Sequence, residues 1–401
     1  MSTFAQLVKL NLSRPRKPIL LLAAVLFLVL SVLLEIFARL PAVQSQLPYQ
    51  AYGINHAQLE TQLKVLDEFV QHNGAPDCFL FGNSQAFREI NTNAFEAAYE
   101  QASGEDVLCY NFSVTGSQIA TTAAFNKMLV EKYHPRLVVI ATSFLDYTEG
   151  RDKQNDERFK ESEWLKYHAG ETSISGWLME ASYAWRALTY LSYAAPFGMN
   201  FEAVTHEAAQ WDTELAPNGN AISKDFINPL APAEDGFVKK MRAEFGNFGI
   251  SENNFSALEE VVAFDQSQGA QVILVEMMYH PALLDLNDSR GNPRADRARI
   301  LDLIARVNAQ LDALAQQRGI VYIHFDSSLP IPEKGWFDLY HLNNNGAKVF
   351  SAWLGEQVAG WVIANPMTGA FLKSNFMQEK SINHREHGVH TLSRCSYGRD
   401  F

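Results

Sequence analysis

The sequence predicts a three-layer α/β protein, in which helices cover both faces of a parallel sheet, with an N-terminal membrane-spanning helix and a helical insertion. Short apolar runs alternate with helical segments in two blocks of the chain, which is typical of parallel strands covered by helices on both faces. A 20-residue apolar run near the start predicts the membrane helix. A polar and then aromatic stretch between the two blocks predicts the insertion.

The composition allows a large folded domain and argues against nucleic-acid binding. The chain has 401 residues, of which 47% are hydrophobic and 19% are charged, so it can bury a sizeable core. Its formal net charge is -12, whereas a nucleic-acid partner needs a basic face that neutralises phosphates.

The three cysteines, Cys78, Cys109 and Cys395, do not indicate a disulfide framework. Cys78 and Cys109 lie in two apolar runs, where a free cysteine packs as a small hydrophobic residue. We expect both to be buried thiols. A disulfide between them is the alternative in an oxidising compartment.

Residues 1–17 are basic and residues 18–40 are mostly apolar. From Ile19 to Ala38, 20 residues carry a single charge, Glu35, and as a helix they would cross the roughly 30 Å of a hydrocarbon core. The positive-inside rule then leaves the N-terminus in the cytoplasm and the main domain in the periplasm or outside the cell. A cleaved signal peptide is the alternative, but its apolar core is usually shorter and no clear cleavage site follows. The sequence favours a single-pass anchor.

Beyond the anchor the chain divides into further segments. Apolar residues at near-helical spacing predict a helical neck over residues 41–75. The α/β domain follows in two parts, residues 76–150 and 251–365, separated by an inserted helical cap at residues 151–250. Residues 366–401 show no apolar periodicity and are expected to be a disordered tail. Three histidines recur there without a carboxylate or cysteine at ligand spacing, so no metal site is predicted at His384, His387 and His390.

Five apolar runs predict the strands of the sheet, and four stretches between or after them predict helices. The runs are CFLFGNS, DVLCYNFSVTG, PRLVVIATSFLDY, AQVILVEMMYHP and IVYIHFD, and the helices are expected at residues 117–133, 253–268, 294–318 and 344–364. Ligands of parallel sheets bind at the carboxyl ends of the strands. Ser84, Gly116 and Asp146 all follow strand ends, which supports a shared site.

The inserted cap has two interpretations. It is either a subdomain with its own small core, or a lid or membrane-surface helix beside the active site. Its composition suits both, because the aromatic and apolar side chains available for packing are Trp177, Leu178, Tyr183, Trp185, Leu188, Tyr190, Leu191 and Tyr193.

Three residues form a pattern typical of nucleophilic catalysis. A serine hydroxyl attacks an ester only when a base takes its proton, and a carboxylate usually orients that base. Ser84 follows the first strand of the α/β domain, and Asp338 lies three residues before His341, ahead of the last helix. Each element alone is weak, but together they predict that Ser84 is a nucleophile activated by Asp338 and His341.

The segments FGNSQA, NFSVTG and DLYHLNNNGAKVF resemble the motifs of the SGNH/GDSL hydrolase superfamily. More narrowly, the chain is similar to membrane-anchored members on bacterial cell surfaces that act on acylated polysaccharides or teichoic acids. The resemblance covers about residues 76–364 without the insertion, and it implies a flavodoxin-like fold. It also implies that Ser84 is the nucleophile, that Asp338 and His341 activate it, and that the backbone amides of Ser84 and Gly116 bind the oxyanion.

One motif of the superfamily is missing. Its members ordinarily carry Gly-x-Asn-Asp after the third strand, and the Asn side chain donates to the oxyanion, whereas this chain has ATSFLDY. Either Ser143, Thr142 or Asn83 replaces that donor, or the enzyme is slow, or other groups tune acyl transfer. An ionised Asp146 would repel an oxyanion, so it is expected to bind a sugar hydroxyl or to cap a turn.

Four residues are candidates for lining the substrate pocket: Asn83, Arg88, Asp146 and His280. Arg88 lies on the first turn after Ser84, where it could pair with a substrate carboxylate, with Glu89 or with Asp146. His280 follows a core strand and reaches the same edge of the sheet, either as a pocket residue or in a structural role.

The leading hypothesis is an extracytoplasmic serine esterase or O-acyltransferase that forms an acyl-Ser84 intermediate on an acylated cell-surface glycan or another ester. A membrane protein that exports acyl groups is a candidate partner. The alternatives are a catalytically silent scaffold that binds glycan or an export complex, and a lipase-like esterase whose cap handles acyl chains. No metal or other cofactor is expected, since no ligand cluster and no Gly-x-Gly-x-x-Gly after the first strand is present.

Overall fold

The computed structural model describes seven parts of the chain: residues 17–44, 52, 56–153, 162–194, 214–221, 248–285 and 297–366.

Five parallel strands form the central sheet, in the order β2-β1-β3-β4-β5. This is the flavodoxin-like order, with the direction of winding reversed between β1 and β3. The predicted α/β fold with a parallel sheet is confirmed. The strands are β1 (Cys78–Phe81), β2 (Cys109–Asn111), β3 (Leu137–Thr142), β4 (Gln271–Glu276) and β5 (Val321–Ile323).

Helices cover both faces because alternate residues of each strand point to opposite sides. In β1, Phe79 and Phe81 face one apolar core, whereas Cys78 and Leu80 face the other. The first core is covered by α3 (Ala57–Asn73), α6 (Ile119–Tyr133), α14 (Glu252–Ser267) and α15 (Arg297–Arg318). The second is covered by α4 (Ser84–Glu89), α5 (Thr92–Ser103) and α16 (Asn344–Ala364).

Helix α3 belongs to the α/β domain and is not the separate neck that the sequence predicts for residues 41–75. Its side chains Leu59, Leu66 and Phe69 are buried in the first core. Apolar residues at helical spacing are the same in a neck and in a helix that covers a sheet, so the pattern could not distinguish the two. Between residue 41 and the start of α3, the structure describes only the short helix α2 (Pro41–Gln44), Tyr52 and His56.

The N-terminal helix α1 (Lys17–Ala38) has 22 residues, and its apolar side chains are exposed. Among the described residues it is the one helix long and apolar enough to cross a membrane. An anchor and a signal peptide both satisfy this description.

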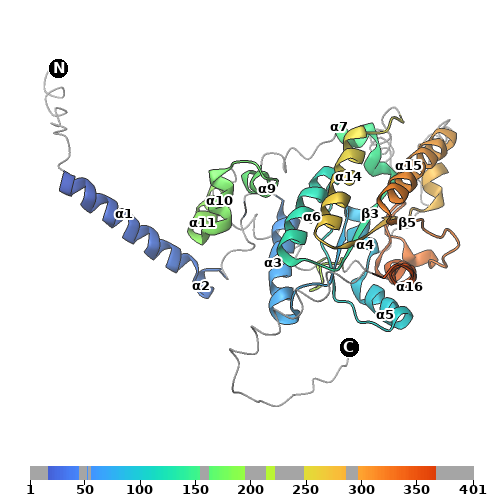
Figure 1. Ribbon diagram of the computed structural model, residues 1–401, viewed down its shortest axis with the longest axis horizontal. Coiled ribbons are helices and arrows are strands. Elements are labelled where there is room, and N and C mark those ends of the chain that lie inside the picture. Colours follow the sequence, from blue (N-terminus) through green and yellow to red (C-terminus); the bar gives the residue numbers. More distant parts are fainter. Residues whose placement is uncertain are drawn as a thin grey trace, which may run out of the picture.

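The described part of the insertion consists of four short helices and one turn. The helices are α7 (Glu149–Lys153), α9 (Glu163–His168), α10 (Ile174–Ala181) and α11 (Tyr183–Ala194). Figure 1 shows α10 and α11 between α1 and α3, away from α4, α16 and β5. The turn at residues 214–221 packs instead on Phe87 of α4. Helices α9–α11 therefore do not form a lid over α4.

Cys78 and Cys109 are buried free thiols opposite each other in β1 and β2, so the disulfide alternative is not realised. Cys395 and the tail histidines lie outside the described residues.

Candidate active site

Gly82 follows β1 at a point where the chain passes too close to α4 and β3 for any side chain. A Cβ atom on Gly82 would lie 2.5 Å from the Cβ of Ala86 and 2.8 Å from the carbonyl oxygen of Ala141. Asn83 then caps α4, since its Oδ1 accepts the backbone N–H of Gln85 at 2.8 Å. Together these residues place Ser84 at the first helical position, half-buried at the carboxyl end of β1.

Asp338 and His341 lie on the connection between β5 and α16. The Oδ1 atom of Asp338 accepts the backbone N–H groups of Tyr340 and His341, both at 2.8 Å, which closes a tight turn. Its Oδ2 atom lies 2.7 Å from Nδ1 of His341. The Nε2 atom of His341 lies 2.9 Å from Oγ of Ser84. The structure thus brings the three predicted catalytic residues into one hydrogen-bonded chain.

The partners of His341 indicate its tautomer. An ionised Asp338 only accepts hydrogen bonds, so Nδ1 carries the proton and Nε2 is free to accept the proton of Ser84. Burial acts to raise the pKa of Asp338, but hydrogen bonds and charge from His341, together with the two backbone N–H groups, hold that pKa below its usual value. Asp338 is therefore a carboxylate at neutral pH.

Gly346 holds this connection against the start of α16. A Cβ atom there would lie 2.2 Å from the carbonyl oxygen of Gly335, which belongs to the short 3-10 helix η3 (Glu333–Gly335). Asn343 caps α16 and donates from Nδ2 to the Lys334 carbonyl at 2.7 Å. The glycine that follows the Asp-His motif thus allows a close backbone contact.

Two backbone N–H groups are available for an oxyanion. Among the described residues, no hydrogen-bond partner is found for the N–H of Ser84 or of Gly116. Gly116 is exposed with φ 78°, a conformation that favours glycine. Its turn is tied to the end of β1, because Val114 N–H and Ser117 Oγ both donate to the Gly82 carbonyl at 3.1 Å.

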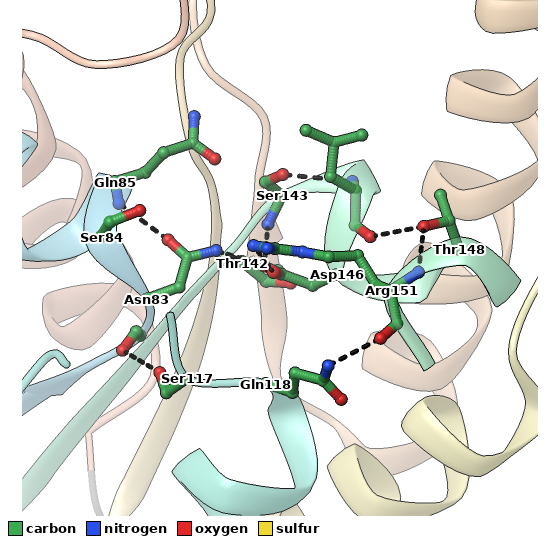
Figure 2. Close-up of polar contacts among 12 residues, drawn as sticks. Asn83, Ser84, Gln85, Ser117, Gln118, Thr142, Ser143, Asp146, Thr148 and Arg151 are labelled. Carbon is green, nitrogen blue, oxygen red and sulfur yellow. Dashed lines mark hydrogen bonds and ion pairs between the residues drawn. The ribbon is translucent and has the colours of Figure 1, made fainter. Parts of the chain in front are cut away.

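Asp146 caps a turn, which was one of its two predicted roles. It accepts the N–H of Ser143 at 2.9 Å in the capping box of the 3-10 helix η1 (Phe144–Tyr147). It also accepts the amide of Asn83 at 2.7 and 3.0 Å and lies 3.7 Å from Arg151 (Figure 2). With 3% of its surface exposed, Asp146 is not placed to bind a sugar hydroxyl.

The same network narrows the choice of a third oxyanion donor. The amide of Asn83 is directed at Asp146, and the hydroxyl of Thr142 donates to Tyr147 at 2.9 Å. The hydroxyl of Ser143 accepts the N–H of Leu145 at 3.1 Å, and no described residue accepts its proton. Ser143 is therefore the remaining candidate among the three residues that the sequence suggests.

Replacing Ser143 by Ala is expected to slow acyl transfer by on the order of 100-fold, because a lost oxyanion donor typically has such an effect. Ser143→Thr keeps a hydroxyl and should retain most of the rate. The rate of acylation and the unfolding midpoint should be measured for both variants. A rate unchanged in a folded Ser143→Ala variant would show that the hydroxyl only caps η1.

Arg88 does not pair with Glu89 or Asp146, as the sequence had suggested it could. Its Nη2 atom lies 3.7 Å from the carboxylate of Glu214 in the insertion, and its guanidinium lies 4.4 Å from the ring centre of Phe337. The ring stacking joins α4 to the segment that carries Asp338. Arg88 therefore has partners within the protein, and these contacts favour a structural role for it.

The contacts of His280 favour the structural role among its two predicted roles. Its backbone N–H donates to the Leu339 carbonyl at 2.8 Å, its Nδ1 accepts the N–H of Ala282 at 3.1 Å, and its ring meets Trp336 edge-on at 5.1 Å. Burial lowers the pKa of its imidazole, which favours the neutral form.

Glu89 is a site residue that the sequence did not reveal. Its side chain is fully buried near Gln85, the backbone of Met278 and Leu342, and the charge of Asp338. Burial, and then the Asp338 charge, raise the pKa of Glu89 well above its usual value, so the carboxyl is neutral. Nothing in the sequence distinguishes it from an exposed helix glutamate.

Comparisons with known proteins give distant structural likenesses only. No protein-family profile and no curated protein matches the chain by sequence. A GDSL-like lipase from Bacteroides thetaiotaomicron is 10% identical over 71% of this chain and 88% of that chain, with a TM-score of 0.31. The lipase/acylhydrolase from Enterococcus faecalis is 10% identical over 71% of this chain and 95% of that chain, with a TM-score of 0.33. A gut microbial diltiazem-metabolizing enzyme is 11% identical over 71% and 47% of the two chains, with a TM-score of 0.34. Likenesses this distant carry no argument for activity, which depends on the site itself.

Proposed function

We propose that this protein is an extracytoplasmic, membrane-anchored serine esterase or O-acyltransferase that works through an acyl-Ser84 intermediate. The observation that carries the proposal is the chain of hydrogen bonds from Ser84 through His341 to Asp338, with links of 2.9 and 2.7 Å. These three side chains come from connections 257 residues apart in sequence, and a merely structural serine would not need this arrangement.

The reaction follows from the geometry. Oγ of Ser84 attacks the carbonyl carbon of an ester while Nε2 of His341 takes the hydroxyl proton. The backbone N–H groups of Ser84 and Gly116 stabilise the oxyanion that forms. His341 then returns the proton to the leaving alcohol, which leaves an acyl group on Ser84. Water or a sugar hydroxyl attacks the acyl-enzyme while His341 takes the proton of that acceptor. The bond between the acyl carbon and Oγ of Ser84 then breaks, and His341 returns the proton to Oγ.

The anchor bears on the choice of substrate. A retained α1 with its basic end in the cytoplasm would hold Ser84 near the outer face of the membrane, where acylated cell-surface glycans are ester substrates within reach. A transferase there would take acyl groups from a membrane export partner. A lipase-like esterase on other esters is the nearest competing activity.

The test is a burst experiment with p-nitrophenyl acetate on the full chain in detergent micelles. We expect a rapid release of nitrophenol close to one equivalent of enzyme, abolished in Ser84→Ala and in His341→Ala. Ser267→Ala changes an exposed serine on α14 and should keep the burst. Mass spectrometry of the quenched protein should find the acetyl group on Ser84.

The outcomes separate the candidate functions. If the folded wild type releases nitrophenol no faster than Ser84→Ala, a catalytically silent scaffold becomes the preferred function. The missing Asn after β3 is then the best explanation for the lack of activity. If the burst occurs, added glycan acceptors distinguish the two activities: a transferase releases the acyl group faster onto glycan than to water, and an esterase does not.

A further inference from the structure

The end of α1 is joined to the start of α11 by the side chain of Glu35. Its carboxylate accepts the hydroxyl of Ser182 at 2.7 Å and the backbone N–H groups of Tyr183 and Ala184 at 3.1 Å each. The first N–H groups of a helix have no partner within the helix, so Glu35 caps α11. Glu35 is the single charge in the apolar run, and this contact gives it a partner in the folded insertion.

A series of stacked side chains continues from this contact to Trp164 of α9, which is buried in the first core of the α/β domain. Arg39 binds Glu35 at 2.8 Å and lies 4.6 Å from the ring centre of Tyr183. Arg186 lies between the rings of Tyr183 and Tyr52, at 4.7 and 4.2 Å. Tyr52 stacks in turn on a further aromatic ring at 4.3 Å, that of the buried Trp164. Alternating cations and aromatic rings thus connect the end of α1 to α9.

Helices α10 and α11 expose large apolar side chains at helical spacing. Ile174 and Trp177 on α10 are 75% and 51% exposed, and Trp185 and Leu188 on α11 are 37% and 50% exposed. Each pair has the three-residue spacing that puts side chains on one face of a helix. Apart from α1 and the adjoining Leu40, these four are most of the large apolar side chains that the described residues expose.

We propose that α10 and α11 form an interfacial foot that lies in the lipid head-group region of the bilayer crossed by α1. This rests on the proposed retention of α1 as an anchor. Glu35 lies within the last turn of α1, so its bonds place the start of α11 at the level where the apolar helix ends. Figure 1 shows both helices beside that end of α1. Tryptophans and amphipathic helices favour this depth.

The foot would fix the orientation of the catalytic domain on the membrane. A single helix followed by a flexible linker leaves a domain free to rotate, whereas the stacked residues from Arg39 to Trp164 hold α1, the foot and α9 together. A cleaved signal peptide would remove the Glu35 cap from α11. The foot therefore requires α1 in the mature protein.

The test uses the full chain in phosphatidylcholine–phosphatidylglycerol vesicles, with an environment-sensitive fluorophore on one introduced cysteine at a time. Cys395→Ser serves as background, since the cysteines of β1 and β2 are buried. Probes at Ile174→Cys and Leu188→Cys should emit at shorter wavelength and be quenched by nitroxide-labelled lipids. A probe at Leu28→Cys in α1 marks the bilayer core, and one at the exposed Glu100→Cys on α5 marks water.

Each result decides a separate point. If the Ile174 and Leu188 probes are as open to iodide as the Glu100 probe while the Leu28 probe is in lipid, the foot is overturned and the anchor stands. If the Leu28 probe is also in water, the anchor fails and the foot with it. Probes shielded from iodide but insensitive to the lipid quenchers would mean that protein covers this face, which also overturns the foot.

Discussion

Under the proposed mechanism, Asp338→Asn is expected to slow acylation by about 10,000-fold while leaving the protein folded, because this exchange reverses the tautomer of His341. The amide oxygen of the new side chain can still accept the N–H groups of Tyr340 and His341, so the turn at this position is preserved. The atom facing Nδ1 of His341 becomes an amide nitrogen, which donates where the carboxylate accepted.

The consequence reaches Ser84 through the imidazole ring. With Nδ1 turned into an acceptor, the single proton of neutral His341 moves to Nε2, which then donates to Oγ of Ser84 at the observed 2.9 Å contact. A ring nitrogen that already carries a proton cannot take another from the serine. The loss should therefore fall on the acylation step, while the unfolding midpoint stays near that of the wild type.

Asp326→Asn is the matched control for this change. Asp326 lies on the same connection between β5 and α16, and its Oδ1 likewise accepts a backbone N–H two residues on, that of Ser328, but no histidine of the described residues binds it. Its variant should acylate at the wild-type rate. The Asp338→Asn variant should be measured in a stopped-flow burst assay. If it keeps more than about a tenth of the wild-type rate, His341 does not depend on this carboxylate and the proposed catalytic triad is contradicted.

The sheet and the meeting of Ser84, His341 and Asp338 could be predicted because they depend on local patterns and one geometric rule. Apolar strands alternating with helices fix a parallel sheet, and parallel strands end at one edge. That rule is sufficient to place Ser84 after β1 near the connection that follows β5. The helices predicted at residues 253–268 and 344–364 agree with α14 and α16 within one residue.

Other features depend on contacts that no local pattern encodes. Asn83 and Asp146 are 63 residues apart, and only the fold reveals that the amide of the first is directed at the carboxylate of the second. Arg88 meets Glu214 from the insertion, a partner whose approach has no sequence signal. Aromatic residues such as Trp177 occur both in a small core and on an exposed apolar face. The sequence pattern could therefore not distinguish a core from an interfacial face.

Asp265→Asn is expected to stabilise the protein at neutral pH, by on the order of 2 kcal/mol, because it removes a charge that the fold buries poorly. Asp265 lies on α14 and is fully buried against α6. Its Oδ2 accepts the amide of Asn126 at 2.8 Å, and its buried Oδ1 has no partner among the described residues. Burial outweighs this bond and raises the pKa of Asp265 from 3.8 to about 7.

The sign of the pH dependence follows from that difference. Between the two pKa values the folded protein holds a proton that the unfolded chain has lost, so raising the pH favours unfolding through this group. The penalty begins near the unfolded value of 3.8 and is complete above about 7. Asparagine cannot ionise, and its oxygen can still accept the amide of Asn126. The variant therefore avoids the cost of burying a charge at high pH, where that cost is largest.

Unfolding midpoints at about pH 4.5 and about pH 8 test this argument. The variant should unfold roughly 4 to 8 °C higher than wild type at the higher pH, and close to wild type at the lower one. Asp302→Asn is the control, because its carboxylate is exposed and bonded to Arg306 on the helix surface. A gain in stability that is equal at both values of pH would mean that Asp265 is uncharged throughout and that the gain comes from packing alone. A loss of stability in the variant at the higher pH would show that the buried charge is favourably paired.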